Sequence, residues 1–459
     1  MGEYAPMSNP DWRDPLLAGA RRLDVEVAGR DLAGWPDYTP RTAVSAWQLE
    51  RAIAAVWDFS VYGGSYGEDD ATVLAAAVAA AIEARLPLLT LVRSGGTRLQ
   101  EGMAALVGIP RARIALRSLA QARLAHLSVA DAPTTGGVWI AVTCGADLRV
   151  AVQGATVGFA GPRVVEAFTG VLPAKGSHTA ASAYAAGLVD AVLPGEQVPT
   201  WIDRVLTALT PGVDVAVPDP PVPGTPREVT GWAQVERSRA RTQGGRDLLG
   251  ALLSDYVPLR AARGDSTVAA GIGRCAGMPV VAVALAAELG SRPTPDGYRF
   301  AARAYRLADR LGLPVLSLVD TPGADPGTVS EEDGIAAAMG EALDGLLACT
   351  TPTLALVHGE GGSGGALAAA AADLVLVTDE AYFAAIGPEG ASAALRRPAQ
   401  ECADLMRITP ADLLRLGVAD ALATTADVPA YLHALRETPD ATRRARRTAR
   451  WGGAVGVTP

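Results

Sequence analysis

The sequence predicts an α/β protein built from two copies of one domain. Short apolar runs alternate with alanine-rich segments, a set of motifs recurs at a nearly constant distance, and a proline-rich stretch separates the two sets. The chain has 459 residues, enough for two large domains, and 49% of them are hydrophobic, enough for a buried core. A disordered chain is therefore excluded.

Each copy is expected to alternate buried strands with helices. Runs rich in Val, Leu and Ile predict strands at 88–92, 315–319 and 353–357. Alanine-rich segments predict helices at 71–84, 300–310 and 334–347. Asp70 is the expected N-cap of the first of these helices.

Five motif pairs carry the repeat, and their spacing varies only between 226 and 230 positions. They are Leu86-Pro87 with Leu313-Pro314, Gly136-Gly137 with Gly364-Gly365, Ala146-Asp147-Leu148 with Ala372-Asp373-Leu374, Gly161-Pro162 with Gly387-Pro388, and Gly187–Asp190 with Gly417–Asp420. Matches that stay in register indicate a duplicated unit rather than chance.

The same patterns divide the chain into five parts. They predict an N-terminal extension (1–45), a first domain (46–212), a proline-rich linker (213–226), a second domain (227–440) and a flexible arginine-rich tail (441–459).

Composition excludes several classes of protein. Acidic residues outnumber basic ones, 49 to 40, which argues against nucleic-acid binding. No two of the cysteines are spaced as a CxxC pair and the histidines are isolated, so neither a disulfide framework nor a metal site is expected, and a reduced cytoplasm fits. The N-terminus lacks a signal-peptide pattern, and the apolar stretch 71–82 is too short to cross a membrane.

Each copy places two glycine turns after predicted strands. In the first copy they contain Gly95-Gly96 and Gly136-Gly137, and in the second Gly323 and Gly364-Gly365. The later turn in each copy precedes a segment that can begin a helix, where backbone N–H groups are unpaired. Two such donors that converge on one oxygen form an oxyanion hole. The alternative interpretation is that these are ordinary turns. No phosphate-binding loop or dinucleotide fingerprint is present.

Several longer motifs give the chain a family resemblance. The first half resembles the β subunit of acetyl-CoA carboxylase carboxyltransferase, through Gly63-Gly64-Ser65, Ser94–Gly102, Pro133–Gly137 and Gly158–Val164. The second half resembles the α subunit, through Gly297-Tyr298-Arg299, Leu318–Ala324, Gly359–Ala368 and Gly387–Ala391. The resemblance covers about residues 45–425, so the chain looks like a β–α fusion.

The resemblance implies a fold and a reaction. The fold is two tandem crotonase-like (ClpP/crotonase) domains, each a spiral of ββα turns. The reaction moves the carboxyl group of carboxybiotin, carried on a separate protein, to the α-carbon of acetyl-CoA or another short acyl-CoA. By the same resemblance, Gly136 and Gly137 hold the thioester enolate, Gly364 and Gly365 hold the biotin ureido oxygen, and Gly95 and Gly96 line the acyl-CoA side. Further substrate-binding positions are Arg98, Gly161, Arg163, Gly323, Ala324 and Ala366.

Other polar residues near these turns have ordinary interpretations. His358 is expected to be structural, and Asp320 and Glu360 are expected to cap or brace turns. Arg163 and Arg299 are expected either to meet the phosphates of CoA or to form surface ion pairs.

The chain departs from the family in two ways. The zinc ribbon that usually begins the β subunit is missing, so no zinc is expected. No biotin-attachment motif exists, because Lys175 is the only lysine, and no region remains for a biotin carboxylase. A carrier protein and a biotin carboxylase are therefore expected partners, together with a second copy of the chain in a homodimer or larger homo-oligomer, with the active site between unlike halves of two chains.

Two other functions stay open at this point. One is a biotin-independent decarboxylase of a malonyl thioester, on CoA or a carrier protein, which would use the same enolate site. The other is a non-catalytic scaffold within a carboxylase. The motifs do not fix the acyl chain, nor whether the pathway makes fatty acids or polyketide precursors.

Overall fold

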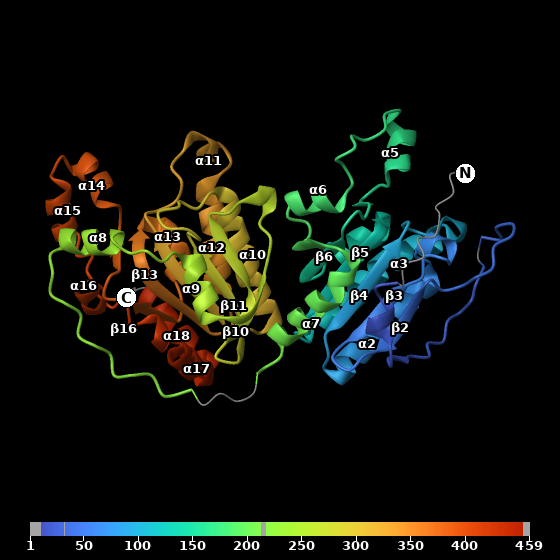
Figure 1. Ribbon diagram of the computed structural model, residues 1–459, viewed down its shortest axis with the longest axis horizontal. Helices are drawn as coiled ribbons and strands as arrows, with labels where there is room; N and C mark the ends of the chain where they lie inside the picture. Colours follow the sequence, from blue (N-terminus) through green and yellow to red (C-terminus); the bar gives the residue numbers. More distant parts are fainter. Residues whose placement is uncertain (1–10, 32, 213–216, 453–459) are drawn as a thin grey trace, which may run out of the picture. The chain divides into compact units, whose positions relative to one another are not determined.

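The computed structural model describes residues 11–31, 33–212 and 217–452. The chain divides into two compact units, residues 1–206 and 207–459 (Figure 1). The division falls within helix α7 (Val198–Leu209), a few residues before the expected proline-rich linker, and residues 213–216 of that linker lie outside the described residues. Each unit is described separately below.

The first unit is built around one eight-stranded sheet. Its strands are β1 (Arg21–Arg22), β2 (Val44–Gln48), β3 (Ile53–Trp57), β4 (Leu88–Ser94), β5 (His126–Thr135), β6 (Leu148–Val152), β7 (Val157–Gly158) and β8 (Ala191–Leu193). Their order is β1-β2-β3-β4-β5-β6-β8, and β7 pairs with the far end of β5. The pairs from β3 to β8 are parallel, whereas β1, β2 and β3 pair antiparallel.

The helices of the first unit connect these strands. They are α1 (Asp14–Leu17), α2 (Glu68–Ala84), α3 (Met103–Gln121), α4 (Gly136–Val138), which continues as a π-helical segment (Trp139–Thr143), α5 (Pro162–Thr169), α6 (Ala180–Ala185) and α7. Since β1 and β2 belong to the sheet, part of the expected N-terminal extension is integral to the domain.

The second unit repeats this plan. Its strands are β9 (Ser254–Pro258), β10 (Val268–Cys275), β11 (Met278–Leu285), β12 (Val315–Thr321), β13 (Thr353–Gly362), β14 (Leu374–Val377), β15 (Tyr382–Ala384) and β16 (Ala421–Leu422). Their order is β9-β10-β11-β12-β13-β14-β16, and β15 pairs with the far end of β13. This is the strand order of the first unit, so the predicted duplication is confirmed.

The second unit contains more helices than the first. They are α8 (Gly231–Arg239), α9 (Gly245–Leu252), α10 (Pro295–Leu311), α11 (Thr328–Glu332), α12 (Ile335–Ala348), α13 (Ser363–Ala370), α14 (Pro388–Leu395), α15 (Ala399–Leu405), α16 (Pro410–Arg415), α17 (Val428–Glu437) and α18 (Asp440–Trp451). The helices and strands expected from the sequence are present, and most are a few residues longer than expected.

The sheets give the repeat an exact register. Leu88 pairs with His126 in the first sheet and Val315 with Thr353 in the second, so both strands correspond at a distance of 227 positions. The sequence match of Gly136-Gly137 with Gly364-Gly365 is therefore off by one. Gly136 corresponds to Ser363 and Gly137 to Gly364, and Gly136 and Ser363 share a left-handed backbone, with φ of 66° and 64°.

The aspartates of the repeated motifs have the same structural role in both units. Each carboxylate accepts the backbone N–H that begins a neighbouring strand segment: Asp147 from His126 at 2.7 Å, Asp373 from Thr353 at 2.9 Å, and Asp420 from Val375 at 2.7 Å. Asp190 accepts from Arg149 in the same way, at 2.9 Å. Buried N–H groups at strand starts need such acceptors.

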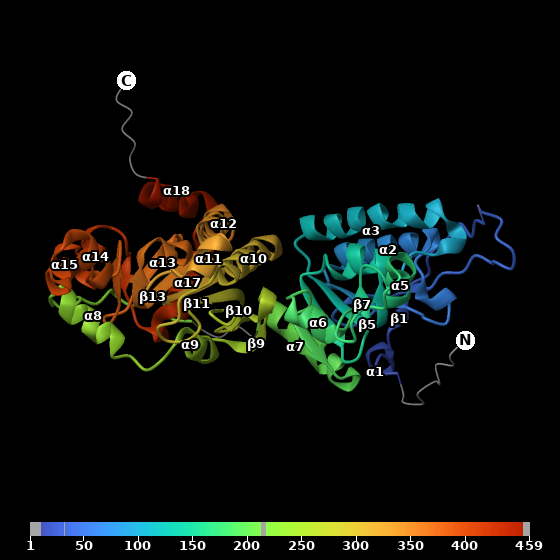
Figure 2. The same ribbon diagram turned by 90° about the horizontal axis from the view of Figure 1, so that it is seen from above.

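Helices cover the sheets in layers (Figure 2). In the first unit, α2 and α3 pack side by side against one face, with a core that includes Trp57, Leu74 and Leu88. In the second unit, α10 and α12 pack together on one face, while α9 and α17 share a core with the other face, through residues such as Leu249, Leu356 and Leu432. No helix in the described ranges is long and apolar enough to cross a bilayer.

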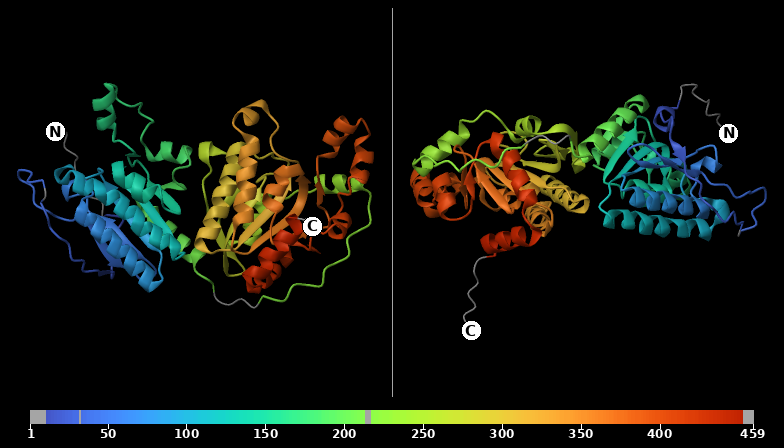
Figure 3. Two further views of the ribbon diagram at one scale, coloured as in Figure 1. Left: turned by 180° about the vertical axis from the view of Figure 1, so that it is seen from behind. Right: turned by 90° about the horizontal axis from the view of Figure 1, so that it is seen from below.

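The C-terminal region differs from the expected flexible tail. Residues 440–451 form α18, which lies outside α12 (Figures 2 and 3). Arg447 is buried and donates to the carbonyl oxygens of Leu346 and Cys349, at 3.3 and 2.7 Å. Its guanidinium also lies 3.5 Å from the fully buried carboxylate of Asp373. The arginine spacing of this segment therefore reflects one buried helix face, and residues 453–459 lie outside the described residues.

Replacement of Arg447 by Met should lower the free energy of unfolding by roughly 1–3 kcal/mol, because the carbonyl oxygens of Leu346 and Cys349 would lose this donor and the buried Asp373 would keep Arg443, at 3.6 Å, as its remaining charged partner. Arg446→Met is the matched control, since Arg446 is exposed on the same helix. Urea unfolding of both variants checks this. Equal stability of the two variants would show that the buried contacts of Arg447 do not stabilise the fold.

Candidate functional site

In the first unit, the turn after β4 is shaped by Gly95 and Gly96. The Gly95 N–H donates to the Gly63 carbonyl at 2.9 Å, and the Gly96 N–H donates to the Ser94 hydroxyl at 3.1 Å. Gly96 has a φ of +115°, which favours glycine. These two glycines form the turn, but their own N–H groups are already used.

The turn after β12 in the second unit has the same construction. Gly323 has a φ of +125°, and its N–H donates to the Thr321 hydroxyl at 3.2 Å. Ser94 and Thr321 occupy corresponding positions and brace the two turns in the same way.

The free donors of these turns are one residue further on. In the first unit, the backbone groups of Gly96 and Arg98 are bonded to Tyr66, and the N–H of Thr97 has no acceptor among the described residues. In the second unit, the N–H of Ala324 is likewise without an acceptor there, whereas Asp325 donates to Pro293 at 3.0 Å. Ala324 was expected at the site, and Thr97 was missed.

The start of a helix lies beside each turn. A Cβ on Gly136 would lie 3.0 Å from the Gly96 Cα and 3.8 Å from the Thr97 nitrogen. A Cβ on Gly365 would lie 2.7 Å from the Ala324 nitrogen. In each unit a turn with an unpaired N–H therefore lies against the start of a helix, where the first N–H groups have no intrahelical acceptor, and these are the components from which an oxyanion hole is built.

Gly364 and Gly365 play different parts. A Cβ on Gly364 would meet only Met339 Cε, at 3.5 Å, so that position faces open space. A Cβ on Gly365 would lie 2.6 Å from the hydroxyl of Tyr298 as well as against Ala324, so Gly365 allows close packing. Gly364 is exposed, whereas a Cβ on its counterpart Gly137 would lie 2.4 Å from Ile109 and 2.9 Å from the hydroxyl of Thr97. Ala366 is fully buried, so its side chain is part of the core rather than a substrate contact.

Arg98 is in the interior and not at the site. It is fully buried and bonds to the Asp70 and Glu101 carboxylates, at 2.7 and 3.0 Å, and to oxygens of Ser65 and Arg41. Asp70 is the third residue of α2 rather than the expected N-cap, and its carboxylate accepts the N–H of Gly67, the N-cap, at 2.8 Å. The expected contact of Arg98 with substrate is therefore wrong, and Arg98 instead supports the turn after β4.

The two other arginines singled out from the sequence differ from each other. Arg299 forms ion pairs with Asp296 and Asp333, at 3.2 and 2.9 Å. Arg163 is exposed near the start of α5, which Gly161 caps, and it has no charged partner among the described residues. Of these two arginines, Arg163 is the one that has no charged partner in the described part of the chain.

Arg292 is a cation that the motifs did not indicate. Its Nη1 donates to the Pro322 carbonyl at 3.5 Å and would lie 3.6 Å from a Cβ on Gly323. It is exposed, so a positive charge lies at the edge of the second-unit turn. Because Arg292 lies outside the glycine motifs, the sequence alone did not indicate that it lies near the site.

His358, Asp320 and Glu360 form buried structural contacts, as expected. Arg241 donates to Asp320 Oδ1 at 2.7 Å and to the His358 carbonyl at 2.7 Å, and the Tyr382 hydroxyl donates to Glu360 at 2.6 Å. Burial, assisted by the Arg241 charge and opposed by Asp320, lowers the pKa of His358 to about 4. The imidazole is therefore neutral at pH 7.

Gly365→Ala should lower the free energy of unfolding by about 1–3 kcal/mol, because the new methyl group meets backbone atoms. Gly364→Ala is the matched control and should leave stability unchanged or raise it by up to about 1 kcal/mol, since alanine favours helices. Denaturant titration distinguishes the two. A larger loss for Gly364→Ala would contradict the assigned packing.

The buried histidine predicts a pH dependence. Because its folded pKa of about 4 lies below the unfolded value of 6.5, the unfolded chain takes up a proton first. The stabilisation is present above pH 6.5 and is lost as pH falls toward 4, amounting to roughly 3 kcal/mol. His358→Gln should flatten this part of the stability curve relative to wild type. Parallel curves for the two proteins would show that His358 does not titrate as described.

Comparisons with known proteins identify the family. Residues 227–431 match the model of acetyl co-enzyme A carboxylase carboxyltransferase-like proteins. The β/α carboxyl transferase subunits of acetyl-coenzyme A carboxylase from Salinispora tropica are 37% identical, covering 100% of this chain and 88% of that protein. A probable biotin-dependent acyl-coenzyme A carboxylase beta3 subunit from Mycobacterium bovis is 33% identical, covering 93% and 91%.

A solved structure supports the same assignment at the level of fold. Transcarboxylase 12S, crystallised as a hexamer with hydrolysed methylmalonyl-coenzyme A, superposes with a TM-score of 0.75 at 21% identity, over 92% of this chain and 88% of that one. The crotonase-like fold expected from the motifs is thereby confirmed. The chain belongs to the acetyl-CoA carboxylase carboxyltransferase family, with β-like and α-like parts in one polypeptide.

Proposed function

We propose that the protein is the carboxyltransferase component of a biotin-dependent acyl-CoA carboxylase and that the N–H pairs of its two units are the catalytic groups. Membership of the family supports carboxyl transfer. The observation that carries the residue assignment is the repeated arrangement of a glycine-shaped turn, one unpaired N–H and an adjoining helix start.

In the first unit we assign Thr97 and Gly137 to the thioester. Removal of the α-proton of an acyl-CoA moves negative charge onto the carbonyl oxygen. Two fixed N–H donors stabilise that charge more than they stabilise the neutral carbonyl, which lowers the barrier. Thr97 is held for this by the bonds of Tyr66 to the residues on either side of it.

In the second unit we assign Ala324 and Gly364 to the ureido oxygen of biotin. A carboxylated biotin, bound from its carrier protein, supplies the activated carboxyl group. The donor set fits an oxygen that gains negative charge, because the Ala324 N–H is unpaired and Gly364 faces open space. The positive charge of Arg292 beside this turn favours an anionic group there.

Binding of the CoA moiety is assigned to Arg163. Its guanidinium is exposed and without a charged partner among the described residues, so it can meet a phosphate without breaking an ion pair. Gly95, Gly96 and Gly323, which were expected to bind substrate, are assigned here as the residues that form the turns and let substrate approach the backbone.

The complete carboxylase on this proposal includes a biotin carboxyl carrier protein, a biotin carboxylase and further copies of this chain. The relatives support these partners, since one is named as a subunit of a biotin-dependent carboxylase and transcarboxylase 12S is a hexamer. We further propose that the enzyme acts in the cytoplasm and needs no zinc.

The test uses purified full-length protein and malonyl-CoA, with and without free biotin, following loss of the carboxyl group from malonyl-CoA. The expected result is turnover that depends on biotin, the reverse of the carboxylation half-reaction. Equal turnover without biotin would contradict the proposal.

Removal of single N–H donors tests the residue assignment. Ala324→Pro should lower the biotin-dependent rate at least about 100-fold with little change in the KM for malonyl-CoA, because it removes one donor from the biotin side. Thr97→Pro should lower the rate similarly on the thioester side. Circular dichroism and thermal unfolding of both variants serve as folding controls. Wild-type rates in both folded variants would exclude these donors.

A further inference from the structure

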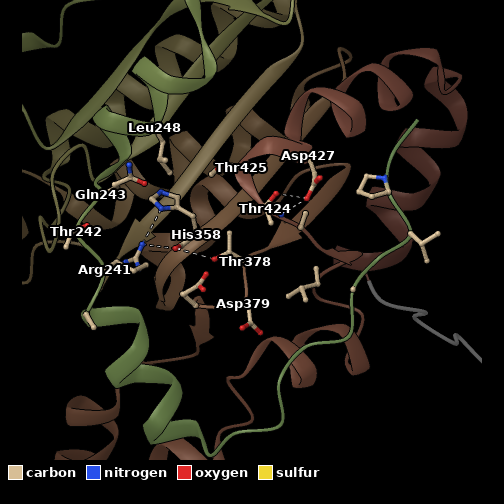
Figure 4. A pocket seen from close by; sticks show the side chains of 17 residues that line it. Arg241, Thr242, Gln243, Leu248, His358, Thr378, Asp379, Thr424, Thr425 and Asp427 are labelled. Atoms are coloured by element: carbon tan, nitrogen blue, oxygen red, sulfur yellow. Dashed lines mark hydrogen bonds between the residues drawn. The ribbon is translucent and has the colours of Figure 1, made fainter. Parts of the chain in front are cut away.

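The second unit contains a pocket that the proposed transfer reaction does not use. Its volume is about 620 Å³, within the range of small-molecule sites. Among the residues that line it are His358, Thr378 and Leu248 (Figure 4), together with Leu422 and with Val222 of the segment before α8. The side chains of His358 and Leu356 project from the same face of β13, and Leu356 belongs to the core shared with α9 and α17.

The buried histidine in this pocket has an unused hydrogen-bonding atom. His358 is 4% exposed, and its Nε2 has no partner. Its Nδ1 lies 3.3 Å from Nη1 of Arg241, and a guanidinium can only donate, so Nδ1 accepts. In the neutral ring the proton is then on Nε2, which is a donor without an acceptor. Buried donors of this kind are costly unless something accepts from them.

The first unit shows what occupies the corresponding place. By the register of the strands, Asp131 of β5 corresponds to His358 of β13, and Arg93 of β4 corresponds to Asp320 of β12. The indole N–H of Trp12 donates to Asp131 Oδ2 at 2.9 Å. An aromatic ring of the chain itself therefore satisfies the polar group at this position.

A third pair of corresponding residues shows where the indole ring of Trp12 lies in the first unit. Short 3-10 turns precede α7 and α17, so Gly195 of the first unit corresponds to Thr425 of the second. A Cβ on Gly195 would lie 2.8 Å from Cδ1 of Trp12, so the indole lies directly against that turn. Thr425 lines the pocket of the second unit. The space that Trp12 fills in one copy thus corresponds to a cavity in the other.

We propose that this pocket binds a small molecule with a planar nitrogen heteroaromatic ring, such as a quinoline or a purine, whose ring nitrogen accepts a hydrogen bond from His358 Nε2. The donor and acceptor roles in this hydrogen bond are the reverse of those in the first unit. There an indole N–H donates to a carboxylate, and here an imidazole N–H needs an acceptor nitrogen.

The charges around the pocket restrict the ligand further. Three carboxylates line it, those of Asp379, Glu380 and Asp427. Arg241 is the only arginine or lysine among the residues that line it, and its donors already bond to Ser238, His358 and Asp320. Asp379 and Glu380 pair with Arg237, at 2.8 and 3.8 Å, but no cation that lines the pocket is left to bind a phosphate, so the ligand is neutral or cationic and the site differs from one for a nucleotide.

The test uses full-length protein with ring-labelled histidine, whose four histidines give a simple NMR spectrum. Quinoline should shift the His358 signal saturably and leave the other three in place. Naphthalene, which has the same shape without the nitrogen, should bind at least about tenfold more weakly. Absence of a saturable shift at His358, or equal affinity for the two rings, would overturn the proposal.

Two variants test the hydrogen-bond donor of His358 and the volume of the pocket separately. His358→Phe removes the donor and should abolish the preference for quinoline over naphthalene. Thr425→Phe fills the cavity without touching His358 and should prevent the shift of a still visible His358 signal. Thermal unfolding verifies that both variants fold. Unchanged quinoline binding in either folded variant would overturn the proposal.

The first unit provides a control in which the opposite ligand preference is expected. Trp12→Ala opens the corresponding space next to Asp131, an acceptor, so indole should raise the thermal stability of this variant more than quinoline does. A variant that responds equally to both rings would remove the correspondence between the copies and, with it, the basis of the proposal.

Discussion

The close approach of two successive strand ends is the constraint on which each unit depends. In the first unit the turn after β4 and the helix start after β5 are separated by the width of a glycine, and the second unit repeats this contact after β12 and β13. A side chain at Gly136 or at Gly365 would meet the backbone of the neighbouring turn, so backbone atoms approach each other closely at both places. That arrangement gives each unit directed N–H donors without a polar side chain, which suits chemistry on an oxygen that gains charge.

Much of the surrounding structure holds these turns in place. Ser94 and Thr321 bond to the turn backbones, and Arg98 satisfies buried carboxylates and carbonyls beneath the first turn. At the other end of the strands, aspartates accept the N–H groups that begin them. The sheet register is thereby fixed at both ends, and the positions of the donors follow from it.

The repeat, the α/β class, the strand positions and the glycine turns were predictable from the sequence, because apolar periodicity and glycine pairs are local signals. What the sequence could not supply depends on contacts between distant residues. Arg98 lies inside a motif and looks available, but its five donors are used by groups that only the fold brings near. The arginines of α18 look like a solvated tail until Asp373 is seen beneath them. Thr97 has no distinctive neighbours, and its free N–H appears only when the hydrogen bonds around it are known.

The reversal of charge between corresponding positions has a consequence for folding. Tandem copies of one fold can exchange segments and misassemble. Here the segment around Trp12 carries Asp11, which pairs with Arg93 at 3.2 Å; against the second copy the same carboxylate would face Asp320. Arg241 in turn matches Asp320 and would face Arg93 in the first copy. The charge of each segment thus matches the residue on its own sheet and has the same sign as the residue at the corresponding position of the other sheet, which disfavours exchange of the two segments between the copies.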